Sequence, residues 1–129
     1  MNNGTNNGPV SGVSKIKELD DLAVVLGELR TEGKKIVHCH GVFDLLHVGH
    51  LIHFESAKKY GDILIVSITP DKYVQKGFNR PYFNSEQRME CLASIQVIDF
   101  VVLNNSSTAV DIIKKIKPNY YCKGPDYKN

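Results

Sequence analysis

The sequence lacks the features that mark several large classes of protein. No apolar run in its 129 residues approaches the roughly 18–20 residues that span a bilayer. The segment before Gly12 has neither the basic start nor the apolar stretch of a secretory signal. The charges nearly balance, with 16 Lys and Arg against 14 Asp and Glu, so we expect no broad basic surface of the kind that nucleic-acid binders carry, while a local basic pocket stays open. These absences predict a protein that binds neither membranes nor nucleic acids.

Cysteine is also scarce. The three cysteines, Cys39, Cys91 and Cys122, are odd in number and widely spaced, and no two of them form a CxxC pair. This pattern argues against a disulfide framework and favours a protein of the reducing cytoplasm. No internal repeat is visible at periods of roughly 20–50 residues.

What remains fits one folded domain. The length suits a single compact unit, and 42% hydrophobic residues are enough to form a core. Residues 1–13 are rich in Asn and Gly and have little to bury. We therefore predict a disordered tail over residues 1–13 and a folded domain over residues 14–129.

Apolar patterning predicts strands that alternate with helices. The expected strands cover residues 35–40, 62–69, 99–103 and 119–123, and the expected helices cover residues 20–32, 49–60, 85–95 and 107–117. The expected helix caps are Asp20 or Asp21, Asn84 or Ser85, and Ser106 or Ser107. Apolar strands with short connections indicate an α/β fold, a Rossmann-like parallel sheet with helices on both faces. Ligands of such sheets bind at the carboxyl ends of the strands.

The loop after the first of these strands carries the pattern richest in chemistry. Gly41 allows a sharp turn and close approach of a ligand. His47 and His50 are three residues apart at the expected helix start, so they share a face, and Gly49 between them leaves room. A helix N-terminus also supplies free N–H groups and a partial positive charge, which attract anions. The segment therefore predicts a pocket for phosphate oxygens.

Less specific interpretations stand beside this one. A bare HxGH pattern occurs by chance, and a histidine at a helix start is often a cap or a surface residue. The histidines from His38 to His53, with Cys39, suggest a metal site, but the usual zinc-ligand spacing is missing. Cys39 is more simply a core residue. Arg88 also has a plain alternative, an exposed helical arginine that pairs with Glu86 or Glu90.

The GxFD and HxGH patterns together point to a family. Gly41-Val42-Phe43-Asp44 followed by His47-Val48-Gly49-His50 resembles the signature of the cytidylyltransferase-like nucleotidyltransferases. The resemblance extends over about residues 34–127, including segments 62–72, 80–88, 97–102 and 114–127. It is greatest for the nucleotidyltransferase domains of ADP-heptose synthases. Such enzymes condense a nucleoside triphosphate with a phosphorylated alcohol or sugar and release pyrophosphate.

The resemblance implies roles for individual residues. His47 and His50 would grip the triphosphate and stabilise the transition state, and Lys76 would be a third catalytic residue. The nucleotide-binding residues would be Gly41, Val42, Phe43, Gly49, Lys123, Gly124 and Asp126, and the acceptor-binding residues Asp44, Arg80 and Arg88. Mg²⁺ would accompany the triphosphate, held mainly by its oxygens and by water, with no metal ligand from the protein.

Two departures from the family pattern accompany these implications. His40 precedes Gly41, where relatives often carry a small polar residue or an aromatic. The family usually continues into an R-x-x-G-I-S-T-[ST] segment that binds the triphosphate, whereas this sequence ends at Asn129. We therefore expect a domain truncated at the C-terminus and belonging to a longer chain.

The predicted function follows from the motif and the resemblance together. We expect a nucleotidyltransferase that joins a nucleoside triphosphate to a sugar phosphate or polyol phosphate, with ATP favoured over CTP. The alternatives are a non-catalytic nucleotide-binding module and a His-rich metal-binding protein. Family members commonly pair, so a homodimer is a further expectation.

Overall fold

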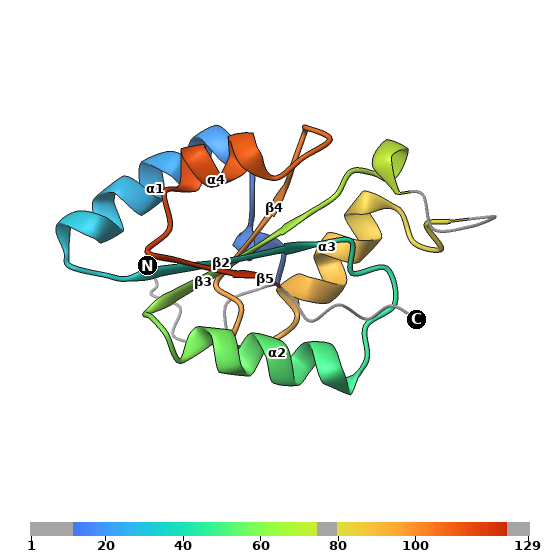
Figure 1. The fold of residues 1–129 in the computed structure, drawn as a ribbon, viewed down its shortest axis with the longest axis horizontal. Coiled ribbons are helices and arrows are strands. Elements are labelled where there is room, and N and C mark those ends of the chain that lie inside the picture. Colours follow the sequence, from blue (N-terminus) through green and yellow to red (C-terminus); the bar gives the residue numbers. More distant parts are fainter. Residues whose placement is uncertain (1–11, 75–79, 124–129) are drawn as a thin grey trace, which may run out of the picture.

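A five-stranded parallel sheet forms the centre of the computed structural model, which describes residues 12–74 and 80–123 (Figure 1). The strands are β1 (Ile16–Lys17), β2 (Ile36–Gly41), β3 (Ile63–Ile68), β4 (Phe100–Leu103) and β5 (Tyr120–Lys123). They lie in the order β1-β4-β3-β2-β5, and every pairing is parallel. The Rossmann-like α/β fold predicted from the alternating pattern is thus confirmed.

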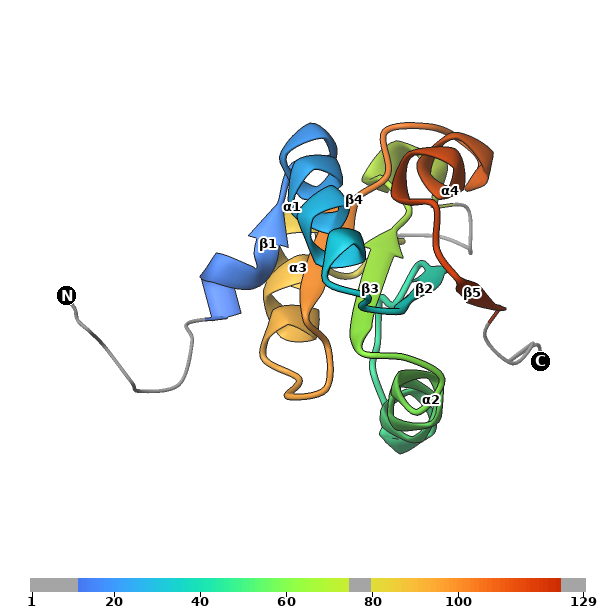
Figure 2. The same ribbon diagram turned by 90° about the vertical axis from the view of Figure 1, so that its left-hand side faces the viewer.

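In the described residues, four α-helices cover the two faces of the sheet. They are α1 (Leu19–Thr31), α2 (Val48–Lys58), α3 (Ser85–Ala93) and α4 (Val110–Ile116), and two 3-10 turns, η1 (Gly12–Lys15) and η2 (Asp71–Tyr73), accompany them. Helices α1 and α4 lie on one face and α2 and α3 on the other (Figures 1 and 2). Within the described ranges, no helix is both long and apolar enough to cross a membrane.

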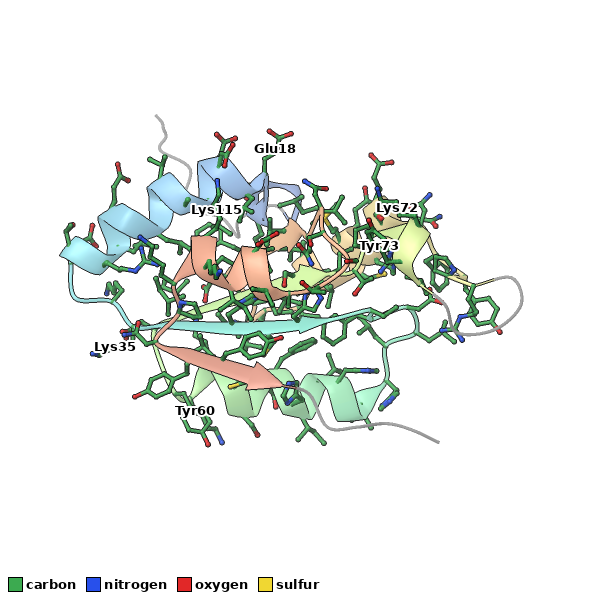
Figure 3. All side chains as sticks on the ribbon, turned by 45° about the horizontal axis from the view of Figure 1, so that its top comes forward. Glu18, Lys35, Tyr60, Lys72, Tyr73 and Lys115 are labelled. Carbon is green, nitrogen blue, oxygen red and sulfur yellow. The ribbon has the colours of Figure 1, made fainter. Side chains whose placement is uncertain are left out.

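Each face of the sheet has its own hydrophobic core, because side chains alternate along a strand. In β2, Ile36 packs under α1 and α4, whereas Val37 packs under α2 and α3. The core under α1 and α4 contains Leu22, Leu26, Ile36, Ile65, Val102, Ile112 and Ile116. Lys115 on α4 also pairs with Asp20 on α1 at 2.9 Å, at the surface (Figure 3).

Two of the predicted helix starts are wrong. Helix α1 begins at Leu19 after Glu18, which makes no side-chain cap, so neither Asp20 nor Asp21 is the cap. Helix α4 begins at Val110, not at Ser106 or Ser107. The Asn104 amide binds the carbonyls of Ser106 and Thr108 at 3.2 and 2.7 Å and keeps residues 104–108 in a loop.

The predicted cap of α3 is confirmed, because the Asn84 side chain accepts from the Gln87 N–H at 2.8 Å. Strand β1 was not predicted. Its two residues are too short for a periodic pattern, and it forms by pairing with Val101 and Val102 of β4. Gly12 and Val13, which fall within the predicted tail, belong to η1.

The strand order creates a switch point beside β2. The chain proceeds from β2 to β3 and β4 in one direction and then returns to place β5 on the other side of β2. Connections that leave in opposite directions open a crevice at the carboxyl ends of the two strands, where ligands of such sheets bind. Gly41 is the last residue of β2 and the HxGH segment follows it, so the crevice is expected there.

Leu26 tests the core under α1 and α4. Leu26→Ala removes a fully buried side chain, so we expect the free energy of unfolding to fall by about 2–5 kcal/mol. Val24→Ala on the same helix, where the side chain is 65% exposed, is the control and should change it by less than about 0.5 kcal/mol. Urea unfolding followed by circular dichroism measures both, and equal losses would contradict the assigned face of α1.

Candidate active site

The two histidines of the HxGH segment build the start of α2. His47 is the N-cap, and its Nδ1 accepts a hydrogen bond from the Gly49 N–H at 3.0 Å. His50 Nδ1 accepts one from the His47 N–H at 3.1 Å. A neutral imidazole that accepts at Nδ1 carries its proton at Nε2. Each ring therefore serves as a cap through Nδ1 and as a donor through Nε2, so the cap interpretation and the functional one are compatible.

The surroundings of His50 keep it neutral. Burial lowers the pKa of the His50 imidazole below its ordinary value, and the nearby His47 and His53 lower it further. The rings of His47 and His50 lie 4.2 Å apart between centroids, and Phe43 presents its edge to His50 at 5.7 Å. At neutral pH the His50 ring thus offers an N–H donor at the helix N-terminus, which itself carries partial positive charge.

Gly41 makes room for Phe43. A Cβ atom at Gly41 would lie 2.8 Å from Cζ of the Phe43 ring, closer than real contacts allow. Phe43 has a φ of 52° and packs against Phe54 at 5.2 Å between ring centroids. The sequence interpretation gave this space to a ligand, whereas the structure gives it to the Phe43 ring.

Asp44 ties the loop after β2 to residues 80–83. Its side chain is 2% exposed and accepts from Arg80 Nε at 2.8 Å and from the Tyr82 and Phe83 N–H groups at 2.7 and 2.9 Å. Burial alone raises the pKa of this carboxyl, but the two backbone donors and Arg80 outweigh it and hold the pKa below its ordinary value. Both oxygens face the protein's own chain, so Asp44 shapes the site by fixing this loop.

Arg88 binds the same two segments that Asp44 connects. Its side chain is fully buried, which shows that the exposed pairing with Glu86 or Glu90 is wrong. The guanidinium donates to the Val42 carbonyl at 2.8 Å, to the Phe83 carbonyl at 3.2 Å and to Asp71 Oδ1 at 2.6 Å. Its donors are thus directed at the protein, and contact with a phosphate stays a prediction.

Asp71 is a residue of this site that the sequence interpretation missed. It follows the carboxyl end of β3, and this position was the signal that could have identified it. Burial raises the pKa of the Asp71 carboxyl, but Arg88 and Ser85 outweigh that effect and lower it. The Asp71 carboxylate also accepts from the Ser85 N–H at 3.2 Å and so anchors the first turn of α3.

The structure gives fewer contacts for the remaining predicted site residues. Arg80 stacks on the Tyr82 ring, 4.5 Å from its centroid, and its terminal nitrogens bond to no described residue. The backbone of Lys123 pairs with that of His40 in the sheet. Lys76, Gly124 and Asp126 lie outside the described residues. Among the residues described, no group of three or more His, Cys, Asp or Glu side chains could hold a metal ion.

Asp44→Ala should strongly destabilise the folded chain. The change leaves Arg80 and two N–H groups without their acceptor, so we expect a loss of about 3–5 kcal/mol in unfolding free energy at pH 7. Because the pKa of Asp44 is lower in the folded state, its contribution is complete at neutral pH and disappears as the pH falls below about 4.

Urea unfolding between pH 7 and pH 3 measures this effect. The variant should lose less stability than the parent on acidification. The control is Asp20→Ala, which removes the exposed pair with Lys115 and should cost less than about 1 kcal/mol. A variant of Asp44 as stable as that control would contradict the anchoring role.

Comparison with known proteins identifies the family of the chain. The model of the cytidylyltransferase-like family matches residues 38–129. The bifunctional protein HldE of Aliarcobacter butzleri is 41% identical over 117 residues, 89% of this chain and 25% of that protein. HldE of Geobacter metallireducens is 41% identical over 116 residues, 88% of this chain and 24% of that protein. The chain therefore spans about a quarter of the length of these curated relatives.

A solved structure agrees with the fold. The lipopolysaccharide core biosynthesis protein of Thermoplasma volcanium superposes with a TM-score of 0.63 at 27% identity, over 68% of this chain and 72% of that one. The family match includes β2 from His38 onward, the HxGH segment and the loop that Asp44 and Arg88 hold. On this evidence the chain belongs to the cytidylyltransferase-like family.

Proposed function

We propose that this chain is the nucleotidyltransferase domain of an enzyme that makes a nucleotide-activated sugar. It joins a nucleoside triphosphate to a sugar phosphate and releases pyrophosphate. The observation that carries the proposal is the pair of Nε2–H donors that the capping bonds of His47 and His50 set at the N-terminus of α2. Membership in the family and the sugar chemistry in the name of the Thermoplasma relative support it.

The reaction needs little covalent work from the protein. A phosphate oxygen of the acceptor attacks the α-phosphorus and forms the new P–O bond. The bond from the α-phosphorus to the bridging oxygen breaks, and its electron pair leaves with pyrophosphate. Negative charge then grows on the leaving oxygens, where the N–H donors of His47 and His50 and the helix N-terminus stabilise it. Holding both reactants in line supplies most of the rest.

Arg80 is the described cation best placed to receive a phosphate group. Its Nε is bound to Asp44, which fixes the direction of the guanidinium plane. Its terminal nitrogens form the fork that suits phosphate oxygens. Arg88 acts behind it by holding the Val42 carbonyl and the 80–85 loop in place.

Mg²⁺ belongs to the substrate in this proposal. Triphosphate oxygens and water satisfy most of its octahedral coordination, so it binds with the nucleotide and needs no cage of protein ligands. The resemblance to ADP-heptose synthases favours ATP as the nucleotide and a heptose phosphate as the acceptor. CTP and polyol phosphates are the next pair to test.

Calorimetric titration of the chain with MgATP and with MgCTP tests the nucleotide site. We expect MgATP to bind more tightly than MgCTP. In the double variant His47→Asn/His50→Asn the capping acceptors stay and both Nε2–H donors are lost, so binding should weaken by at least about tenfold. If neither nucleotide binds, the proposal fails, and if binding occurs without pyrophosphate release on adding a sugar phosphate, the chain is a binding module.

His47→Asn separates the cap from the donor. Asn is a good N-cap and can accept from the Gly49 N–H, so the free energy of unfolding should change by less than about 0.5 kcal/mol. His47→Ala removes the cap as well and should cost about 1 kcal/mol. Pyrophosphate release should fall by about 10²–10³ in both variants, because both lose the Nε2–H donor. An Asn variant with full activity would show that His47 is only a cap.

A further inference from the structure

A buried chain of polar side chains leads from the middle of the sheet to the crevice. His38 Nε2 lies 2.7 Å from Ser67 Oγ, and His40 Nδ1 lies 2.7 Å from the same oxygen. His38 and Ser67 are fully buried, and His40 is half-buried near the carboxyl end of β2. All three share the sheet face of Ile36 and Ile65, under α1 and α4.

Three linked polar side chains are unusual in a core that has only a structural role. The core on this face contains Ile36, Ile65 and Val102, and the Tyr121 ring of β5 meets the His38 ring edge-on at 5.2 Å between centroids. Polar groups are costly to bury there unless every atom is hydrogen-bonded. In the part of the chain that the structure describes, His38 Nδ1 has no hydrogen-bond partner. Burial, with His40 nearby, lowers the pKa of His38 to about 3, and burial also lowers the pKa of His40. Both rings are therefore neutral at neutral pH.

Neutral rings leave few ways to distribute the protons. If His40 carried its proton at Nδ1 and the Ser67 hydroxyl donated to His38, the proton of His38 would lie on Nδ1, a buried donor without an acceptor. If both rings donated to Ser67, its hydroxyl proton would have no acceptor among the described residues. Orphaned buried donors are rarer than orphaned acceptors. The favoured order therefore runs from His38 Nε2–H to Ser67, and from the Ser67 hydroxyl to His40 Nδ1.

We propose that the hydrogen bonds from His38 through Ser67 lock His40 in its Nε2–H form. His40 then donates a hydrogen bond from Nε2–H to an oxygen of a bound reactant in the crevice beside β2. The inference rests on the proposed nucleotidyltransferase function and adds a residue that sets which reactant fits. His40 lies directly before Gly41, between β3 and β5, at the switch point of the sheet.

The geometry leaves the His40 donor able to take a ligand. The nearest described acceptor, Thr69 Oγ1, is 3.5 Å from His40 Nε2, longer than the roughly 2.7–3.2 Å of a good hydrogen bond. His40 points to the α1 and α4 face, whereas α2, whose N-cap is His47, lies on the other face (Figure 1). A reactant that binds both His40 and the N-terminus of α2 would cross the carboxyl end of β2. Nucleotides and sugar phosphates both carry suitable oxygens.

Imidazole ¹⁵N spectra of the unliganded chain test the lock without any ligand. We expect His38 and His40 both as Nε2–H tautomers, with His40→Gln used to assign the His40 signals. Ser67→Ala should turn His40 into a mixture of tautomers, whereas the matched control Thr69→Val should leave it unchanged. A His40 that carries its proton at Nδ1, or one that Ser67→Ala does not affect, would overturn the proposed order.

Titrating the same labelled chain with MgATP, MgCTP and heptose 1-phosphate tests the contact. Shifts at His40 together with His47 and His50 support the inference, and the reactant that causes the His40 shift identifies the group it contacts. Shifts at His47 and His50 with none at His40 overturn the inference while the proposed function stands. No shift at any of the three overturns the proposed function and the inference with it.

Steady-state kinetics provide a second readout. His40→Leu should raise the KM of the contacted reactant about tenfold while changing kcat less than about threefold, as expected for one lost hydrogen bond. His40→Gln, whose amide can place an N–H near the original Nε2, should recover most of that loss. Equal KM values for the Leu and Gln variants would show that His40 only packs there.

Discussion

The Arg88 guanidinium supplies donors to three segments from a position that water does not reach. It binds the Val42 carbonyl after β2, the Phe83 carbonyl before α3 and the Asp71 carboxylate after β3. The first segment follows β2, and the other two belong to the connection between β3 and α3, so the guanidinium joins the connections that follow two neighbouring strands. Asp44 completes the connection by accepting from the N–H groups of the 80–83 loop whose carbonyl Arg88 binds. One buried cation and one buried anion thereby hold the loops at the carboxyl edge as a unit.

The HxGH pair depends on this unit for position but not for its internal geometry. The His47 and His50 rings accept hydrogen bonds from the backbone N–H groups of Gly49 and His47. The orientation of the two rings is therefore set locally, within residues 47–50. Where those rings lie relative to the crevice depends on the loop that precedes them, and Arg88 and Asp44 hold that loop. Chemistry of this kind relies on donors fixed before the charge develops, and here local and long-range bonds supply this fixing separately.

This division explains what the sequence could predict. The His47 and His50 pair at the start of α2, the Asn84 cap and the parallel sheet come from short spacings and alternating patterns, which a sequence displays directly. The pairing of Asp44 with Arg80 and of Arg88 with Asp71 joins residues 36 and 17 positions apart, and no periodicity connects them. The start of α4 was misplaced because the Asn104 side chain, which binds the loop carbonyls, competes with a serine cap. Tertiary contacts decided the two pairings, and a local side-chain interaction decided the start of α4.

The histidines of β2 also take part in contacts that the sequence pattern does not reveal. Alternation places His38 and His40 on one face, but only the register with β3 puts Ser67 directly beside His40 and within reach of His38. A parallel sheet gains stability from apolar residues at such positions, so a structural role alone gives no reason for three polar ones. Their bonds run in one direction, from an orphaned nitrogen in the core to a donor at the crevice. That polarity gives the carboxyl edge a fixed N–H donor opposite the HxGH helix, and a reactant bound between them would be held from both faces of the sheet.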